Sequence, residues 1–193
     1  MRCLAAQSAP STLGFMDAGS SLSLAEWTVL ALISEGPTHG FAISQITAPR
    51  GDLGRIWHIP KPVVYRAIGR LEEAGLVAPK NVEPGRGPQR TIYQATPAGR
   101  KAAAAWLDTP VEHVRDVRSQ FLVKLALLDR AGTDATGLLR RQKAILQPIA
   151  SAIATERSQC KGFDATLLAW RRATAAAALS FLDGITPPGA SRA

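Results

Sequence analysis

Three side chains that could bind an anion lie close together in the stretch "KPVVYRAIGR", which begins at Lys61. These are Tyr65, Arg66 and Arg70, and helical spacing places them away from the apolar residues of the same stretch. Guanidinium and phenol groups donate hydrogen bonds to phosphate, so this pattern indicates anion binding rather than catalysis. The apolar residues recur at steps of three and four and predict a buried stripe: Val64, Ala67 or Ile68, and Leu71.

More basic residues follow where the period of the sequence changes. "LVAPKNVE" and "RTIYQAT" alternate as strands do, and the turn-forming stretch "PGRGPQ" joins them. This predicts a β-hairpin with Lys80, Arg86 and Arg90 near its tip.

Composition favours a polyanionic partner. The chain has 193 residues, a net charge of +8 and a pI of about 10.2, which favour nucleic acid or an anionic membrane surface. With three histidines and no Ser-His-Asp, Cys-His or paired-carboxylate arrangement, we expect no enzyme, no metal site and no cofactor.

The two cysteines, Cys3 and Cys160, are too few and too far apart for a disulfide framework. They are typical of a reducing compartment, so we expect a cytoplasmic protein. Residues 1–21 make a poor signal peptide, and no apolar run approaches the roughly 20 residues of a membrane-spanning helix.

The order of the expected elements defines a fold. Ser23 and Glu26 have the spacing of a capping box, and they begin the first of two predicted helices. The helix with the basic face follows and starts at Pro62, just after Lys61. After the hairpin, Thr96 as cap and Pro97 at the first position predict a fourth helix. The fold class is therefore mainly α with a small β-hairpin wing, a winged helix-turn-helix domain followed by helices. We expect a flexible tail at 1–21, a winged helix-turn-helix DNA-binding domain at 22–109, a C-terminal helical dimerisation domain at 110–185 and a flexible tail at 186–193.

The helices after Pro110 carry apolar stripes that little else in the chain could cover. Such stripes usually meet a partner helix, so we expect a homodimer held by this region. The expected contact residues are Val114, Val117, Phe121, Leu125, Leu128, Leu168, Leu179 and Leu182.

Three motifs give the chain a family resemblance. "LALISEGPTHGFAI", "VYRAIGRLEEAGLV" and "GRGPQRTIYQATPAGR" resemble the PadR family of transcriptional regulators, in order and in spacing. The resemblance covers Leu24 to about Trp106 and extends more weakly toward residue 183. It implies a homodimeric repressor on an inverted-repeat operator in double-stranded DNA; activators also occur. Such a repressor is often released by a small molecule, for example a small aromatic effector such as a phenolic acid, or a drug.

The resemblance carries DNA contact onto Tyr65, Arg70, Arg86 and Arg90. The chain departs from the family at "IPKPVV", where a small residue usually starts the third helix. Lys61 lies in this segment, so this departure affects the base and phosphate contacts that the resemblance implies for it.

Each site residue also has a plainer interpretation. Arg66 and Arg70 could pair with Glu73 or with other neighbours on the helix, and Tyr65 could bury its ring. Trp106 and Trp170 could hold a flat effector or simply pack. A winged helix can also be a protein-interaction module without specific DNA binding, and this is the alternative function.

Overall fold

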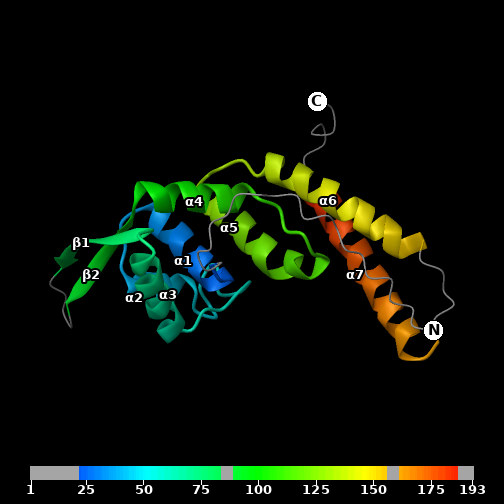
Figure 1. Ribbon diagram of the computed structural model, residues 1–193, viewed down its shortest axis with the longest axis horizontal. Helices are drawn as coiled ribbons and strands as arrows, with labels where there is room; N and C mark the ends of the chain where they lie inside the picture. Colours follow the sequence, from blue (N-terminus) through cyan, green and yellow to red (C-terminus); the bar gives the residue numbers. More distant parts are fainter. Residues whose placement is uncertain (1–21, 84–88, 156–160, 187–193) are drawn as a thin grey trace.

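The computed structural model describes residues 22–83, 89–155 and 161–186. The molecule is elongated (Figure 1), with the β-hairpin and α1–α3 at one end and the paired helices α6 and α7 at the other.

Three helices open the fold: α1 (Leu24–Glu35), α2 (Gly40–Ile46) and α3 (Lys61–Glu73). The expected capping box begins α1, because the Ser23 hydroxyl accepts from Glu26 N and the Glu26 carboxylate accepts from Ser23 N. At α2 the Nδ1 atom of His39 accepts from Ala42 N at 3.0 Å, so this histidine is a helix cap. The first helical residue of α3 is Lys61, one position earlier than expected.

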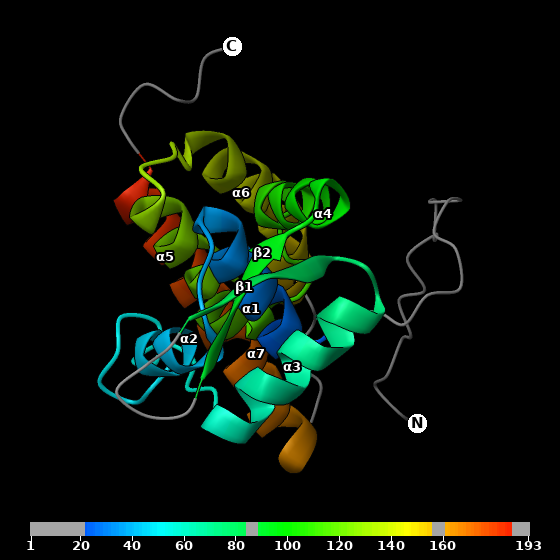
Figure 2. The same ribbon diagram turned by 90° about the vertical axis from the view of Figure 1, so that its left-hand side faces the viewer.

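The predicted hairpin is confirmed. Strands β1 (Val77–Glu83) and β2 (Arg90–Ala95) pair antiparallel after α3, with a register shift between Pro79 and Asn81. The chain between α1 and α2 joins them, since Thr38 and Tyr93 exchange two backbone hydrogen bonds of 3.0 and 2.7 Å. Figure 2 shows the hairpin beside α3. These two backbone hydrogen bonds therefore connect the helix-turn-helix to the wing.

Helix α4 (Pro97–Asp108) runs back over α1 and begins as the sequence predicts. The Thr96 hydroxyl accepts from Gly99 N at 3.0 Å, and Pro97 occupies the first turn. A Cβ at Gly99 would lie 2.0 Å from the carbonyl oxygen of Leu76, so only glycine allows this approach of α4 to the start of β1.

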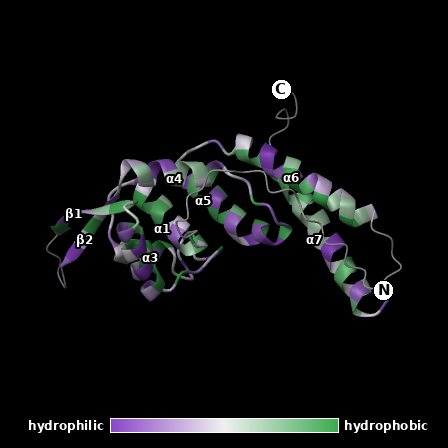
Figure 3. Ribbon diagram, viewed as in Figure 1, coloured by the Kyte–Doolittle hydropathy of each residue, from purple (hydrophilic) through white to green (hydrophobic). Residues whose placement is uncertain are grey.

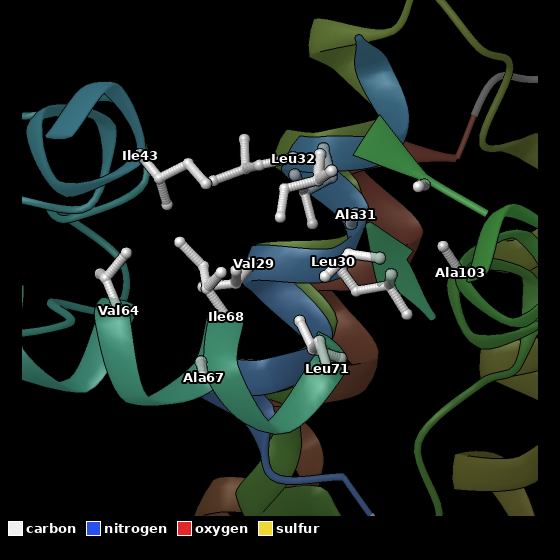
Figure 4. Packing of buried hydrophobic residues seen from close by; sticks show 14 of the residues in the cluster. Val29, Leu30, Ala31, Leu32, Ile43, Val64, Ala67, Ile68, Leu71 and Ala103 are labelled. Atoms are coloured by element: carbon white, nitrogen blue, oxygen red, sulfur yellow. The ribbon is translucent and has the colours of Figure 1, made fainter. Parts of the chain in front are cut away.

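The core of the winged part forms where α1 meets α3 and α4 (Figure 4). The apolar stripe of α3 is confirmed as its contribution: Val64, Ala67, Ile68 and Leu71 are all buried. Since α1 carries buried residues around most of its surface, it is the central helix of this part.

The second half of the described chain is helical. A 3-10 turn η1 (Val114–Asp116) and a π turn η2 (Val117–Phe121) lead into α5 (Leu122–Arg130), followed by α6 (Thr136–Thr155) and α7 (Phe163–Ile185). The apolar residues between Val114 and Leu128 recur at helical steps, but the first two turns of this segment are irregular. Helices α6 and α7 lie antiparallel, and hydrophobic residues recur along both (Figure 3).

The expectation that little else covers the stripe from Val114 to Leu128 is wrong. Phe121 has no exposed surface and packs in a second cluster with residues of α6 and α7, including Leu146 and Leu182. The reason is that these later helices fold back onto the stripe within the same chain. Over the described residues, no helix is long and apolar enough to cross a membrane.

Candidate nucleic-acid interface

Helix α3 has one buried and one exposed face, and the exposed face carries the predicted binding residues. Lys61, Tyr65, Arg66 and Arg70 are all exposed, while the opposite stripe holds the helix on α1 and α2. Among the described residues, no carboxylate forms an ion pair with Lys61 or Arg66. These two cations are available to an external anion.

Tyr65 combines the two roles considered for it. Its ring packs against α2, because a Cβ at Gly40 would lie 2.9 Å from a ring carbon of Tyr65. The side of the ring away from Gly40 faces solvent, and the residue is 48% exposed. Gly40 therefore sets how closely α2 and α3 approach, and Tyr65 remains open to a ligand.

Arg70 has an intramolecular partner that the sequence did not indicate. Its Nη1 lies 2.8 Å from Oε1 of Glu26, the buried carboxylate of the α1 capping box. Pairing with Glu73, the plainer alternative, does not occur in the structure. Because about half of the Arg70 side chain stays exposed, the guanidinium still has donors to offer.

An aromatic residue that sequence reasoning missed joins three elements of this surface. The ring of Phe41 in α2 is approached by Lys61 of α3 and by Arg90 of β2. The ring centroid lies 5.4 Å from Lys61 Nζ and 5.3 Å from Arg90 Cζ. Lys61 Nζ also lies 6.0 Å from the Tyr65 ring. The sequence does contain a signal for this role. Phe41 is a large aromatic residue in the first turn of α2, and it does not belong to the buried side of that helix, which contains Ile43.

The hairpin that follows α3 carries further cations. Lys80 on β1 and Arg90 on β2 are exposed, and Arg86 lies outside the described residues. Below them, burial raises the pKa of the Tyr93 phenol, and the nearby Glu72 carboxylate adds to this. Tyr93 therefore stays a neutral hydrogen-bonding group in the base of the wing.

The two tryptophans considered for an effector lie in different places. Trp170 is 67% exposed and lines a pocket of about 860 Å³ between η1, η2, α6 and α7. The pocket has apolar walls, including Val117 and Ile153, with Arg115 and Arg118 beside them. Trp106 is not part of it.

Trp106 is buried against the winged part. Its ring stacks on Trp27 of α1, with centroids 5.6 Å apart and planes 4° from parallel. On α5, Lys124 places its Nζ 4.8 Å from the Trp106 ring centroid and donates to the carbonyl of Thr109 at 2.5 Å. Burial lowers the pKa of Lys124 to about 8. For Trp106, packing is therefore the observed role.

The predicted dimer residues are mostly buried within one chain. Val117, Phe121, Leu128, Leu168 and Leu182 are buried, and Val114, Leu125 and Leu179 are half-buried. A different apolar face is open on α7, where Phe163, Leu167 and Trp170 lie at steps of four and three. The described residues contain no cluster of three or more potential metal ligands.

Residues 29–105 match the sequence model of the transcriptional regulator PadR-like family. No curated protein matches the chain. Similar solved structures include Bacillus subtilis PadR in complex with operator DNA, at 17% identity over 84% of this chain and 97% of that one, with a TM-score of 0.43. The same protein in complex with p-coumaric acid has 16% identity over 85% and 97%, with a TM-score of 0.41. The smu.1704 protein of Streptococcus mutans has 26% identity over 42% and 70%, with a TM-score of 0.35.

At these TM-scores the assignment rests on the sequence match, together with the helix order and hairpin described above. Residues 29–105 are therefore similar in sequence to the PadR-like family of transcriptional regulators.

Proposed function

We propose that this protein is a sequence-specific DNA-binding regulator that acts as a homodimeric repressor on an inverted-repeat operator. The exposed face of α3 carries the proposal: it presents Lys61, Tyr65, Arg66 and Arg70, and the wing cations lie beside it. An α-helix fits the major groove, which is about 12 Å wide. The net charge of +8 supplies the attraction to phosphate.

The residues divide into readers and phosphate contacts. Arg66 is the first candidate for a base contact because it is exposed in mid-helix and has no ion pair among the described residues. Arg70 follows, with part of its donor capacity committed to Glu26. Lys61 at the start of α3 and Lys80, Arg86 and Arg90 of the wing are assigned to the DNA backbone.

A homodimer would present two copies of this DNA-binding surface, one from each protomer. For a two-fold dimer the half-sites lie about one helical turn apart, some 34–36 Å, or a multiple of this. The exposed face of α7 supports self-association, because Phe163 and Trp170 are 77% and 67% exposed. Large apolar side chains grouped on one helix face mark an interaction surface.

The pocket beside α7 supports an effector. A volume of about 860 Å³ is within the range of small-molecule sites, and Trp170 offers a flat wall. Arg115 and Arg118 favour an anionic group. Bacillus subtilis PadR has been crystallised with p-coumaric acid, so we extend the aromatic-acid class to this chain. Trp106, buried against Trp27, is dropped from the proposed pocket.

The test is a salt series on labelled duplexes taken from upstream of the protein's own gene. Affinity for the target duplex should fall steeply as salt rises, and a scrambled duplex should bind more weakly at every salt concentration. Adding p-coumaric acid should weaken only the specific complex. Weak binding with equal affinity for both duplexes would favour the alternative, a protein-interaction module without specific DNA binding.

A further inference from the structure

The cluster of Phe41, Lys61 and Arg90 has a charge arrangement that the fold alone does not require. Two cations from different elements approach the same ring, at 5.4 and 5.3 Å from its centroid. No carboxylate pairs with either cation among the residues that the structure describes. Like charges repel, so an attraction that acts on both cations favours this arrangement.

The aromatic ring supplies part of that attraction. The face of a phenyl ring carries negative electrostatic potential, and a cation within about 6 Å of its centroid is attracted by it. Phe41 is 40% exposed, so its ring is open to solvent while its base is held in α2. Removing the ring would let the flexible Lys61 and Arg90 side chains move apart.

The positive charge of Lys61 and Arg90 favours an anionic ligand on this surface. A DNA phosphate has the required charge, and both cations lie on the surface assigned above to the DNA backbone. We propose that Phe41 is a positioning residue that holds Lys61 and Arg90 together as a two-cation grip on the phosphate backbone. This inference rests on the proposed function, because the anion is taken to be DNA.

A phosphate bound by both Lys61 and Arg90 would contact two parts of the DNA-binding surface at once. Phe41 lies in α2, Lys61 in α3 and Arg90 in β2, so one phosphate contact would fix the helix-turn-helix and the wing together. Long cationic side chains lose rotamer entropy when they bind, and prior ordering by the ring reduces that loss.

The experiment measures affinity for a labelled mixed-sequence duplex, which reports phosphate contacts without knowledge of the operator. Phe41→Leu should weaken binding about 3- to 10-fold at low salt, whereas Phe41→Tyr, which keeps the ring, should stay within about 2-fold of the unchanged protein. Thermal melting of each variant checks the fold.

A double-mutant cycle separates positioning from packing. In a Lys61→Ala, Arg90→Ala background, Phe41→Leu should weaken binding by less than about 2-fold, because no cations remain to be positioned. An equal loss in both backgrounds, or no loss in the unchanged background, would overturn the inference. If the unchanged protein shows no salt-dependent DNA binding, the proposed function fails, and the inference fails with it.

A second measurement covers the case in which Phe41→Leu does not fold. In the unchanged protein the ring current of Phe41 should shift the ε-methylene protons of Lys61 upfield. Proton positions equal to those of a free lysine would contradict the cluster without any mutation.

Discussion

Arg70 is involved in both folding and binding at the residue scale. Its pairing with Glu26 satisfies a buried carboxylate, and that carboxylate also accepts from Ser23 N at 2.6 Å. The same guanidinium lies on the exposed face of α3. A loss of DNA binding in an Arg70 variant therefore has two possible sources, and stability must be measured beside affinity.

Arg70→Ala should lower the free energy of unfolding by about 1–2 kcal/mol, because the Glu26 carboxylate loses a donor. Solvent around the half-exposed Arg70 keeps the loss at this modest level. Urea denaturation measures it, and DNA affinity should fall in the same variant. Arg66→Ala is the matched control, since it should reduce affinity without changing stability. Unchanged stability of Arg70→Ala would mean that the pair with Glu26 contributes nothing.

Lys124 gives a second prediction, in the pH dependence of stability. Burial lowers its folded-state pKa from 10.5 to about 8. Below pH 8 the ammonium is charged in both states, so the burial cost is fully present. Between about pH 8 and 10.5 the folded state loses the proton first, so stability rises with pH. The stability difference between the wild type and Lys124→Met should therefore shift in favour of the wild type over this window. A pH-independent difference would exclude the lowered pKa.

Residue-scale contacts were predictable only where they are local. The Ser23–Glu26 cap, the Thr96 cap and the buried stripe of α3 follow from spacing along one segment. The partner of Arg70 and the position of Phe41 depend on how α1, α2, α3 and β2 cross, which no periodicity specifies. Their contacts join residues far apart in the sequence.

At the scale of elements, one arginine connects α5 to the winged part. The guanidinium of Arg130 binds the Glu35 carboxylate with two donors, at 3.1 and 3.2 Å. It also reaches Asp52 at 2.9 Å, in the segment between α2 and α3. Its pKa is raised, first by the hydrogen bond to Glu35. Helix α5 therefore contacts two places. Its first residue, Leu122, lines the pocket beside α7, and its last residue, Arg130, binds the segment that leads into α3.

Arg130→Ala should loosen that connection without unfolding the chain. We expect faster amide exchange in residues 48–58 and a loss of stability of about 0.5–1 kcal/mol, because the ion pairs are partly exposed. Hydrogen-exchange mass spectrometry measures the first and denaturation the second. Arg140→Ala serves as control, since Arg140 is exposed and has no ion pair among the described residues. Equal exchange in both variants would contradict a role for Arg130 in holding the segment.

The sequence predicted the types of elements better than their packing. Apolar periods and capping residues located the helices and the hairpin, because each signal lies within its own element. They did not reveal that α6 and α7 cover Phe121, since a buried stripe looks the same whether its cover comes from the same chain or from a partner. The π turn at Val117–Phe121 also left no distinct pattern.

At the scale of the whole molecule, the exposed face of α7 predicts self-association. Phe163→Asp with Leu167→Glu should give monomers and reduce operator binding, because charges cannot be buried in an apolar interface without partners. Sedimentation at micromolar concentration measures the assembly. Ala169→Glu adds a charge to an exposed position on another side of the same helix and should leave the assembly unchanged. A wild-type protein that sediments as a monomer would refute the homodimer.

The stacked pair of Trp27 and Trp106 gives the protein an intrinsic spectroscopic probe. Two nearly parallel indoles with centroids 5.6 Å apart couple their electronic transitions. The coupling of their strong transitions adds a far-ultraviolet circular dichroism contribution that falls when the rings separate. Trp27 belongs to α1 and Trp106 to the end of α4. The circular dichroism contribution of the pair therefore reports how these two helices pack against each other. A compound or a DNA duplex that separates these two helices should change this contribution in the unlabelled protein, and Trp106→Phe should remove it.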